Sequence, residues 1–457
     1  MKEAKTIFEP EKPTVPHGWE ILPFQKAAIV VSDKGKRIKQ SAYLPKGKIP
    51  VIDQGQEYIK GYTNDKNMSF EGELPVILFG DHTRSVKYVN QQFAIGAEGV
   101  KILKPSDYYD PKFFYFLLKS LQIPSRGYSR HFQFLKKFYL PVAPKNQQKL
   151  IVDEIEKQFS RLDEAIANLK RVKANLKRYR AAVLKAAVEG KLTEEWRKQH
   201  PDVESASKFL KCILSERKRK WEAEHPGNKY KEPAPPDTSK LPELPRGWVW
   251  TSFEQLIKES QNGLSKRSGD QGKPVFVLRL ADVIEGEICE TDPRSIKLTS
   301  EELGKYLLKS GDLVCIRVNG SRNLTGRLIV FNSNNKWAYC DHFVRFRIFN
   351  KYVSERFLDY FFDTEIARDF IEHNMVSSAG QNTVSQTTMF GVPVPLAPLE
   401  EQKKIIESIE NMLSVTDNVN SYGEINLKRA ERLRQSILKK AFLGKLITHD
   451  VNYYQKI

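Results

Sequence analysis

The chain of 457 residues has few of the residue types on which metal-binding and disulfide-stapled domains depend. It has four cysteines and eight histidines. No two cysteines form a C-x-x-C pair and no two histidines are spaced as H-x-x-x-H, so the sequence indicates neither a zinc ribbon nor a disulfide framework, and we predict no metal site. Free thiols at this density are typical of a reducing compartment, and we expect a cytoplasmic protein.

Catalytic and membrane signatures are missing as well. The sequence has no Walker-type G-x-x-x-x-G-K-[ST], no G-x-G-x-x-G, no G-x-S-x-G and no Asn/Asp-Pro-Pro-Tyr/Phe string. No apolar core of a signal peptide follows the first residues, and no apolar run is long enough to span a bilayer. We therefore expect no membrane association, no bound cofactor and no catalytic site in this chain.

Acidic residues are scarce relative to basic ones. The chain has 74 Lys plus Arg against 56 Asp plus Glu, a net charge of +18, while 40% hydrophobic residues suffice for globular cores. Such a surplus favours a polyanionic partner, nucleic acid before a membrane surface. The alternative is a solvated basic surface without a partner.

An internal repeat is the most informative feature that is present. PVAPKNQQKLIVDEIE begins at Pro141 and PLAPLEEQKKIIESIE begins at Pro395, an offset of 254 residues. The same offset places Gly190 on Gly444 without a gap. Agreement in both register and end signals indicates a duplication.

Each copy of the repeat predicts one long helix. Pro-x-Ala-Pro opens it, and Gly190 or Gly444 is placed to end it. In the first copy an apolar residue recurs every seventh position, which predicts a coiled-coil seam made of Val152, Ile155, Phe159, Leu162, Ile166, Leu169, Leu176 and Val183. The second copy has Thr416, Asn420 and Gly423 on its seam, so we expect an irregularity or break near residues 421–423.

Two unlike interiors precede the helices. Pro16-His17-Gly18-Trp19 opens the first half and Pro245-Arg246-Gly247-Trp248 opens the second, while the sequences that follow differ. Short strands separated by Gly and Asp turns are predicted at 28–32, 75–79, 93–95, 275–280, 313–318, 327–331 and 343–348. Amphipathic helices are predicted at 111–121 and 353–372.

These features divide the chain into seven segments. We expect a tail at 1–15, a first domain at 16–140, a repeat helix at 141–192, a basic and proline-rich linker at 193–244, a second domain at 245–394, a second repeat helix at 395–448 and a tail at 449–457. The predicted fold class is α+β, with two α/β domains joined by two long antiparallel coiled-coil helices and an internal pseudo-two-fold repeat.

Polar loop residues suited to reading DNA occur in both interiors. Arg and Lys can pair bidentately with guanine, Asn and Gln can pair with adenine, and hydroxyls reach phosphates. The first interior offers Lys36, Arg37, His82, Arg84, Lys87, Arg126, Tyr128 and Arg130. The second offers Ser265, Lys266, Arg267, Arg317, Asn319, Ser321, Arg322, Asn323, Arg327, Gln381 and Asn382.

Two histidines also directly follow aspartates, as acid–base pairs can. Asp81-His82 is accompanied by no nucleophile or set of metal ligands in the sequence, and Asp341-His342 directly follows Cys340. For Asp81-His82 a DNA-contacting loop or a structural turn is favoured over catalysis, and for Asp341-His342 a structural role is favoured.

The chain resembles the specificity subunits of type I restriction-modification systems over nearly its whole length. The strings that carry the resemblance are the opening Pro-x-Gly-Trp, the Pro-x-Ala-Pro-x-x-x-Gln-Lys of each helix start, and the helix ends Leu184-Lys185-x-Ala187-x-x-Gly190-Lys191-Leu192 and Leu438-Lys439-x-Ala441-x-x-Gly444-Lys445-Leu446. Residues 231–238 and the loop from Gly311 to Gly326 are also similar.

The resemblance implies that each interior is a target recognition domain reading one half of a bipartite site in double-stranded DNA. It implies that the helices set the gap between half-sites and dock two modification subunits, which use S-adenosylmethionine, with ATP- and Mg²⁺-dependent restriction subunits joining them. Two alternatives stay open: a coiled-coil scaffold that binds nucleic acid without sequence preference, and the recognition subunit of a methyltransferase with no nuclease partner.

Overall fold

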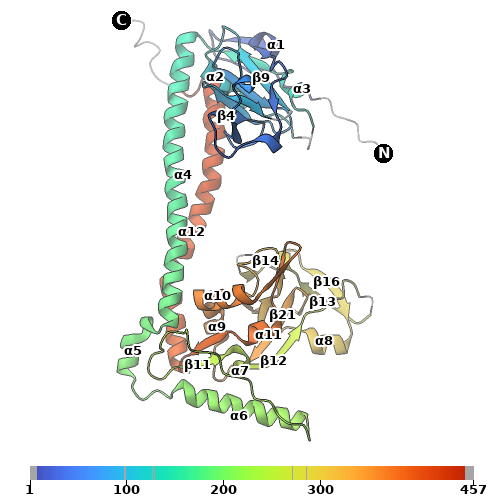
Figure 1. Cartoon of the computed structure of the whole chain (residues 1–457), viewed down its shortest axis with the longest axis vertical. Coiled ribbons are helices and arrows are strands. Elements are labelled where there is room, and N and C mark those ends of the chain that lie inside the picture. The colour runs from blue at the N-terminus through green and yellow to red at the C-terminus, as the bar shows by residue number, and fades with distance from the viewer. Residues whose placement is uncertain are drawn as a thin grey trace. The chain divides into compact units, whose positions relative to one another are not determined.

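The computed structural model describes residues 8–96, 99–125, 127, 129–269, 271–284 and 286–447. Its contacts divide the chain into two compact units. Unit 1 comprises Met1–Arg171 with Tyr422–Ile457, and unit 2 comprises Val172–Ser421. Each unit therefore holds one of the unlike interiors together with parts of both long helices (Figure 1).

Unit 1 contains two four-stranded sheets among its described residues, ordered β2-β9-β6-β7 and β3-β8-β4-β5. The first sheet consists of β2 (Ala28–Val31), β9 (Val100–Pro105), β6 (Val76–Gly80) and β7 (Val86–Val89). The second consists of β3 (Arg37–Ile38), β8 (Ala94–Gly96), β4 (Ile49–Ile52) and β5 (Gly61–Thr63). Helix α2 (Pro111–Ser120) starts where Asp110 accepts from two backbone amides, and it buries Phe113, Phe114 and Leu117 against the first sheet.

Unit 2 repeats the first of these sheets and adds smaller ones. Its four-stranded sheet has the order β12-β21-β17-β19, with β12 (Ile257–Asn262), β21 (Phe343–Ile348), β17 (Leu313–Ile316) and β19 (Leu328–Val330). A second sheet combines β16 (Arg294–Leu298), β13 (Lys273–Leu278) and β20 (Trp337–Tyr339). A third combines β18 (Val318–Asn319), β23 (Gln381–Thr383) and β22 (Val376–Ser378).

Both units close in the same way next to the long helices. In unit 1, β1 (Glu20–Pro23) pairs antiparallel with β10 (Tyr139–Val142), and the short helix α1 (Phe24–Ala27) follows. In unit 2, β11 (Val249–Ser252) pairs antiparallel with β24 (Pro393–Leu396), and α7 (Phe253–Leu256) follows. The two interiors thus share one frame, which is the predicted internal repeat at the level of structure.

The two repeat helices are α4 (Lys145–Val188) and α12 (Leu399–Phe442), each 44 residues long. In unit 1, the beginning of α4 (Ile151, Ile155) shares a core with the end of α12 (Leu438, Phe442). In unit 2, the end of α4 packs with the beginning of α12, where Val183, Leu184 and Ala187 lie in one cluster with Ile405, Ile409 and Leu413. Within each unit the two helix segments therefore run antiparallel, as predicted.

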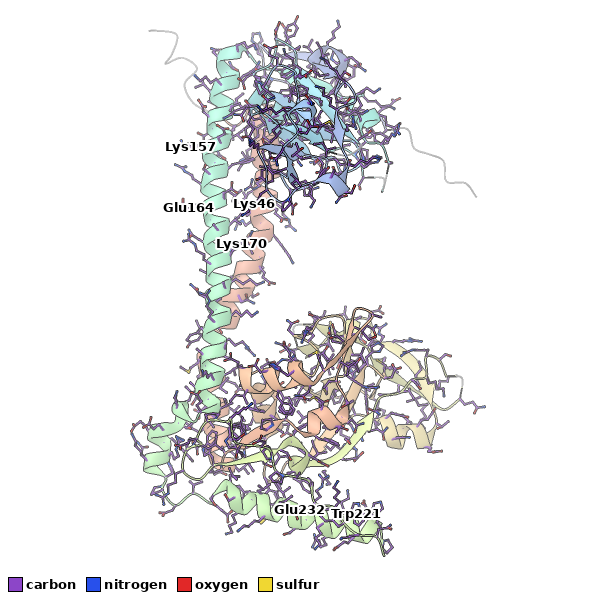
Figure 2. The ribbon with its side chains drawn as sticks, viewed as in Figure 1. Lys46, Lys157, Glu164, Lys170, Trp221 and Glu232 are labelled. Atoms are coloured by element: carbon purple, nitrogen blue, oxygen red, sulfur yellow. The ribbon has the colours of Figure 1, made fainter. Side chains whose placement is uncertain are left out.

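Burial along α4 follows the predicted seam. Val152, Ile155, Phe159 and Val183 are buried, and the four seam leucines and isoleucines between them are half-buried. Figure 2 labels Lys157, Glu164 and Lys170 along α4, and all three are exposed residues outside the seam.

The expected break in the second helix is wrong, because α12 is helical through residues 421–423. Ser421 and Tyr422 are exposed, so the polar and aromatic side chains at this point cost no core packing. Gly423 costs only about 1 kcal/mol in a helix interior, which the packed ends of so long a helix can offset.

The linker is more ordered than a charged, proline-rich stretch suggests. It contains α5 (Glu194–Gln199) and α6 (Ala206–Glu224), followed by an extended segment, and Figure 2 labels Trp221 at the end of α6 and Glu232 beyond it. Most exposed cations of α6 stand one turn from a carboxylate, as Lys218 and Lys220 do from Glu222 and Glu224. Such pairs are typical of a solvated helix face. None of the helices described is long and apolar enough to cross a membrane.

The remaining element predictions are mostly confirmed. Strands occur at each of the seven predicted places, and 343–348 matches β21 residue for residue. The helix predicted at 353–372 is instead two helices, α9 (Glu355–Phe362) and α10 (Glu365–Asn374). Thr364 is extended between them and buried, and its hydroxyl bonds back to the Phe361 carbonyl oxygen, which ends the first helix.

Candidate nucleic-acid interface

The frame that presents the loops is fixed in both units by a tryptophan from the opening Pro-x-Gly-Trp string. The Trp19 indole nitrogen donates to Gln147 Oε1 at 2.9 Å in unit 1. In unit 2, the Trp248 indole nitrogen donates to Glu401 Oε2 at 2.8 Å. Gln147 and Glu401 are 254 positions apart, so the start of each domain is held on the start of its helix by equivalent residues.

A fully buried glutamine repeats this arrangement one residue further along each helix. Gln148 accepts from the Asp110 backbone amide at 2.6 Å, and its own amide donates to Tyr108 O and Ala143 O at 2.8 and 2.7 Å. Gln402 accepts from the Ser354 backbone amide at 2.9 Å and donates to backbone oxygens of Tyr352 and Ala397. Each glutamine thereby ties its long helix to the first turn of the domain's own helix, α2 or α9.

The glycine at each helix end meets the proline that opens a domain. Gly190 and Gly444 both have φ of +68°, a conformation that favours glycine. A Cβ on Gly190 would lie 2.5 Å from Pro245 Cγ, and one on Gly444 would lie 2.1 Å from Pro16 Cγ. The end of each helix is therefore packed against the opening of the domain in its own unit.

In unit 1 the turn that contains His82 is structural in its main contacts. The Asp81 carboxylate is buried and accepts from the Phe132 backbone amide at 2.8 Å, while the Asp81 carbonyl oxygen accepts from the His131 backbone amide at 2.7 Å. The His82 backbone amide donates to Gln54 Oε1 at 3.1 Å. The Asp81 carboxylate therefore stabilises the fold by binding a backbone amide, which argues against an acid–base pair with His82.

The surroundings of Lys87 do not suit the DNA contact that the sequence predicted for it. Its side chain is 5% exposed, and its ammonium donates to the carbonyl oxygens of Asp53 and Glu57, the former at 2.7 Å. Burial lowers the pKa of Lys87 against the opposing charges of Asp53 and Glu57. We reassign Lys87 from DNA contact to support of the 53–57 loop, since strand β7 directs it inward.

The other candidates of unit 1 lie nearer the surface. Arg84 and Arg130 are exposed, and the Arg84 guanidinium donates to Ile123 O at 2.9 Å. Lys36 is half-buried and pairs with Glu71, and Arg37 is half-buried and pairs with Asp33. Arg126 and Tyr128 lie outside the described residues.

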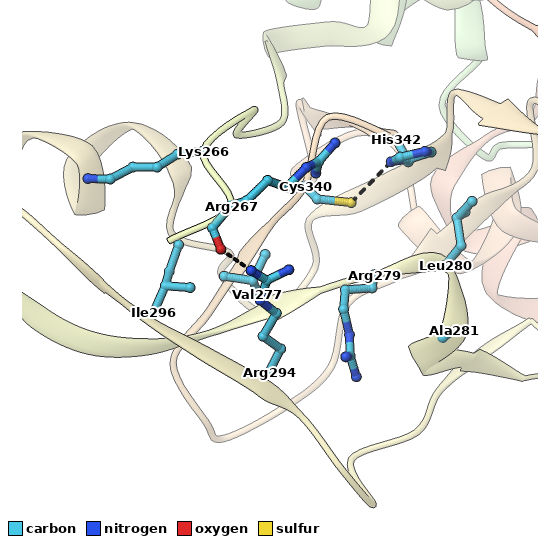
Figure 3. A pocket seen from close by; sticks show the side chains of 10 residues that line it. All are labelled: Lys266, Arg267, Val277, Arg279, Leu280, Ala281, Arg294, Ile296, Cys340 and His342. Atoms are coloured by element: carbon cyan, nitrogen blue, oxygen red, sulfur yellow. Dashed lines mark hydrogen bonds between the residues drawn. The ribbon is translucent and has the colours of Figure 1, made fainter. Parts of the chain in front are cut away.

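In unit 2 the structure gathers four cations around one pocket. The cavity has a volume of about 350 Å³ and is lined by Lys266, Arg267, Arg279 and Arg294, with Val277 and Ile296 among its apolar residues (Figure 3). The sequence had indicated only the first two of these cations. Three of the four already face carboxylates, because Lys266 pairs with Glu302, Arg267 with Asp341 and Arg279 with Asp282.

Cys340 and His342 also line this pocket, and Asp341 lies between them in sequence. Their ligand atoms lie within 4.8 Å of one another, as metal-binding atoms would. Arg267 lies 2.9 Å from Asp341, however, and burial raises the pKa of the Cys340 thiol. Neighbouring cations and a protonated thiol both oppose a bound metal cation, so the surroundings suit an anion better.

The remaining candidates of unit 2, apart from Ser265 beside the pocket residues Lys266 and Arg267, lie around the β18-β23-β22 sheet and the loop after β18. Asn319 accepts from the Ser321 backbone amide at 2.9 Å, Arg322 donates to Glu372 O at 3.1 Å, and Arg327 pairs with Asp363 at 3.3 Å. Arg322, Asn323, Gln381 and Ser265 are exposed, Arg317 is half-buried, and Asn382 is 6% exposed. Asn382 thus lies inside this sheet, unlike its neighbour Gln381.

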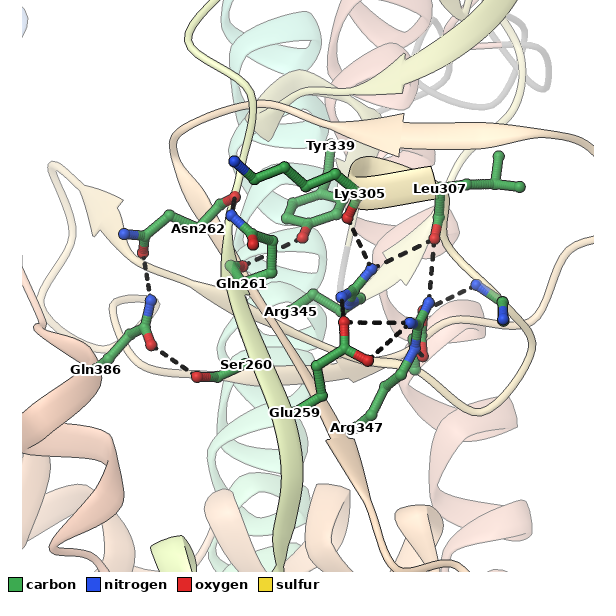
Figure 4. Close-up of polar contacts among 12 residues, drawn as sticks. Glu259, Ser260, Gln261, Asn262, Lys305, Leu307, Tyr339, Arg345, Arg347 and Gln386 are labelled. Carbon is green, nitrogen blue, oxygen red and sulfur yellow. Dashed lines mark hydrogen bonds and ion pairs between the residues drawn. The ribbon is translucent and has the colours of Figure 1, made fainter. Parts of the chain in front are cut away.

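A charged network joins strands β12 and β21 (Figure 4). Arg345 is fully buried and pairs with Glu259, and Arg347 pairs with Asp312 at 2.7 Å. Although burial opposes it, the charges of Arg345 and Arg347 hold the pKa of Glu259 below its usual value. The interior arginines are therefore structural, and sequence position alone did not separate them from surface arginines.

Comparison with known proteins identifies the family. The model of the type I restriction modification DNA specificity domain matches residues 17–178 and 279–428. The chain belongs to this family. It is 32% identical over 308 residues to the type I restriction enzyme StySPI specificity subunit of Salmonella potsdam, covering 67% of this chain and 57% of that protein. It is 27% identical over 309 residues to the EcoKI specificity subunit of Escherichia coli K12, again covering 67% and 57%.

A solved chain from work on complex assembly and conformational transition of the type I R-M system has a fold similar to that of this chain. Its TM-score is 0.55 at 16% identity, and the match covers 95% of this chain and 100% of that one. The chain spans a little more than half the length of the curated relatives it matches. The predicted fold class is confirmed, and Trp19, Gln147 and Glu401 of the shared frame lie within the residues that the family model matches.

Proposed function

We propose that this chain is the DNA-specificity subunit of a type I restriction-modification complex. Each interior, 16–140 and 245–394, is a target recognition domain that reads one half of a bipartite site in double-stranded DNA. The observation that carries the proposal is the repeated anchoring by Trp19 and Gln147 and by Trp248 and Glu401, which presents two unlike loop sets on one frame. An asymmetric, two-part DNA site requires two different sets of contacting loops, each carried on the same scaffold.

The surplus of positive charge supplies the general affinity for DNA in this proposal. Phosphate contacts give binding without sequence preference and make it fall steeply with salt. The exposed candidates of each unit then supply base contacts, among them Arg84 and Arg130 in unit 1 and Arg322 and Gln381 in unit 2.

The long helices, 141–192 and 395–448, act in the proposal as a spacer and as the docking surface for two modification subunits. Apolar side chains left exposed on α12 support the docking role. Met412, Val415 and Val419 in unit 2 are 40 to 66% exposed and recur at the spacing of one helix face. The segments 1–15, 193–244 and 449–457 are the flanking tails and linker.

Chemistry belongs to partner subunits in this proposal. Modification subunits carry S-adenosylmethionine and methylate adenine, which an enzyme can reach only by taking the base out of the stack. Restriction subunits that use ATP and Mg²⁺ join the same assembly, and the complex works in the cytoplasm.

Co-expression of the chain with a modification subunit, followed by genome-wide mapping of methylated adenines, tests the proposal. We expect one bipartite motif with a fixed gap. Scattered methylation, or none, would contradict sequence reading by this chain and favour a scaffold without sequence preference.

A further inference from the structure

The hairpin β22–β23 of unit 2 is built like an element that enters a DNA groove. Its strands pair Val376 with Thr383, Ser377 with Asn382 and Ser378 with Gln381. All three residues of β22 are exposed, and so is Gln381. A two-stranded antiparallel ribbon fits the major groove, which is about 12 Å wide.

The turn of the hairpin is narrow, and its carbonyl side lies close to Gly320 while its outer side is open. Ala379 and Gly380 have φ of +48° and +78°, the pattern of the tightest two-residue hairpin turns. A Cβ on Gly380 would meet no atom within 4 Å. Left-handed backbone at an alanine costs on the order of 1 kcal/mol and persists where its surroundings enforce it, as at binding sites.

The base of the hairpin is held rigidly by Asn382. The Asn382 amide donates to Gly320 O at 3.1 Å and Asn319 O at 3.3 Å, and its oxygen accepts from the Ser377 hydroxyl at 2.6 Å. Strand β23 also pairs with β18, so the ribbon is continuous with the loop that carries Arg322. The two faces of the hairpin therefore differ, because Ser377 and Asn382 on one face are hydrogen-bonded to each other and Asn382 also to the loop after β18.

The opposite face is free to contact a ligand. Alternation along the strands places Val376, Ser378, Gln381 and Thr383 on this face. Val376 is 67% exposed, and among the residues that the structure describes neither the Ser378 hydroxyl nor the Gln381 amide has a hydrogen-bond partner. An amide beside an exposed apolar side chain matches the major-groove edge of an A·T pair, because glutamine pairs bidentately with adenine and apolar groups contact the thymine methyl.

We propose that the β22–β23 hairpin is the ribbon with which unit 2 reads its half-site, and that Gln381 specifies an A·T pair there. This inference rests on the proposed function of the chain as a DNA-specificity subunit. Asn382 is a positioning residue that holds the ribbon, and the adjoining Arg322 is the cation available to a flanking phosphate.

Selection from a randomised duplex library by the full chain, purified with its modification subunit, tests the proposal. Gln381→Ala and Gln381→Met both remove the amide, and Met keeps the length of the side chain. We expect either variant to lose the preference for A·T at one position of one half-site by about 5- to 150-fold, the range for one bidentate contact. The other half-site, the gap, the salt dependence and the thermal unfolding midpoint should not change.

Gln199→Ala, at an exposed glutamine of the linker helix α5, is the matched control and should select the wild-type sequence. Gln381 variants that also select the wild-type sequence would overturn the inference, and so would a lost preference for G·C. If the wild-type chain itself enriches no bipartite sequence, the proposed function fails instead, so the two failures can be told apart.

Discussion

Buried polar side chains decide how firmly each domain sits on its helix. Gln148 and Gln402 use both amide atoms on backbone partners inside the protein, and Glu401 is 1% exposed with Trp248, Thr193 and Arg197 around it. A buried polar group left without its partner costs about 1–3 kcal/mol, so these contacts are specific as well as stabilising. In unit 2 the Glu401 carboxylate also pairs with Arg197 of the linker. The position 254 residues after Arg197 lies outside the described residues.

Asp359 of α9 gives a pH-dependent prediction at this scale. Burial raises the pKa of Asp359 to about 6, against the opposing charge of Arg356 at 2.8 Å. A raised pKa means that the folded state binds this proton more tightly than the unfolded chain does. The stability that the proton provides is present at acid pH and is lost as the pH rises from about 4 to about 6.

Asp359→Asn keeps the shape but removes the charge, so it should be spared this loss. Relative to wild type, we expect its free energy of unfolding to rise by on the order of 3 kcal/mol between pH 4 and pH 7, measured by denaturant titration at each pH. Asp369→Asn, at an exposed position of α10, is the control and should follow the wild-type curve. A constant difference between D359N and wild type would contradict the assignment.

At the scale of elements, the helix ends depend on two glycines that meet prolines. Gly444→Ala should destabilise unit 1 by at least about 1 kcal/mol, because a left-handed backbone disfavours alanine and the new Cβ would overlap Pro16. Thermal or denaturant unfolding measures the loss. Gly304→Ala in α8 (Ser300–Tyr306), where a Cβ meets nothing within 4 Å, should be neutral or slightly stabilising. Equal losses in the two variants would rule out the proposed cause.

Elements with a clear periodicity could be predicted from the sequence, and those fixed by tertiary contacts could not. The seventh-residue spacing from Val152 to Val183 predicted α4, and the pattern of short runs separated by Gly and Asp turns predicted β21. The break between α9 and α10 depends on a buried Thr364, which looks like any other helix residue in the sequence. The continuity of α12 through Gly423 was not predicted, because polar residues and a glycine on the seam do not show that packing at both helix ends keeps the helix intact.

The candidate site was predictable as a set of loops but not residue by residue. Residue type could not distinguish the exposed Gln381 from the buried Asn382, or the exposed Arg84 from the buried Lys87. Arg279 and Arg294 come to the pocket from strands and turns far from Arg267 in sequence, so only the fold unites them. The repeat did contain a usable signal for the buried glutamines, since Gln148 and Gln402 are identical at the 254-residue offset.

At the scale of the whole molecule, the proposed function makes helix length the determinant of the gap between the two half-sites. Deleting one heptad from α4 and the facing heptad from α12 removes about 10 Å of helix and keeps the seam in register. We expect the mapped gap to shorten by about three base pairs at about 3.4 Å each, with both half-sites unchanged. Deleting four residues from α12 alone should instead abolish selection, since it rotates the seam. An unchanged gap after the paired deletion would remove the spacer role.

Exchange of one recognition domain tests the central claim most directly. The chain with residues 16–140 replaced by the corresponding domain of another family member would be co-expressed with the modification subunit, and methylated adenines would be mapped. The account predicts that one half of the motif changes to that of the donor while the other half and the gap persist. A motif that changes in both halves, or in neither, would contradict the claim that two unlike domains on one repeated frame each read their own half-site.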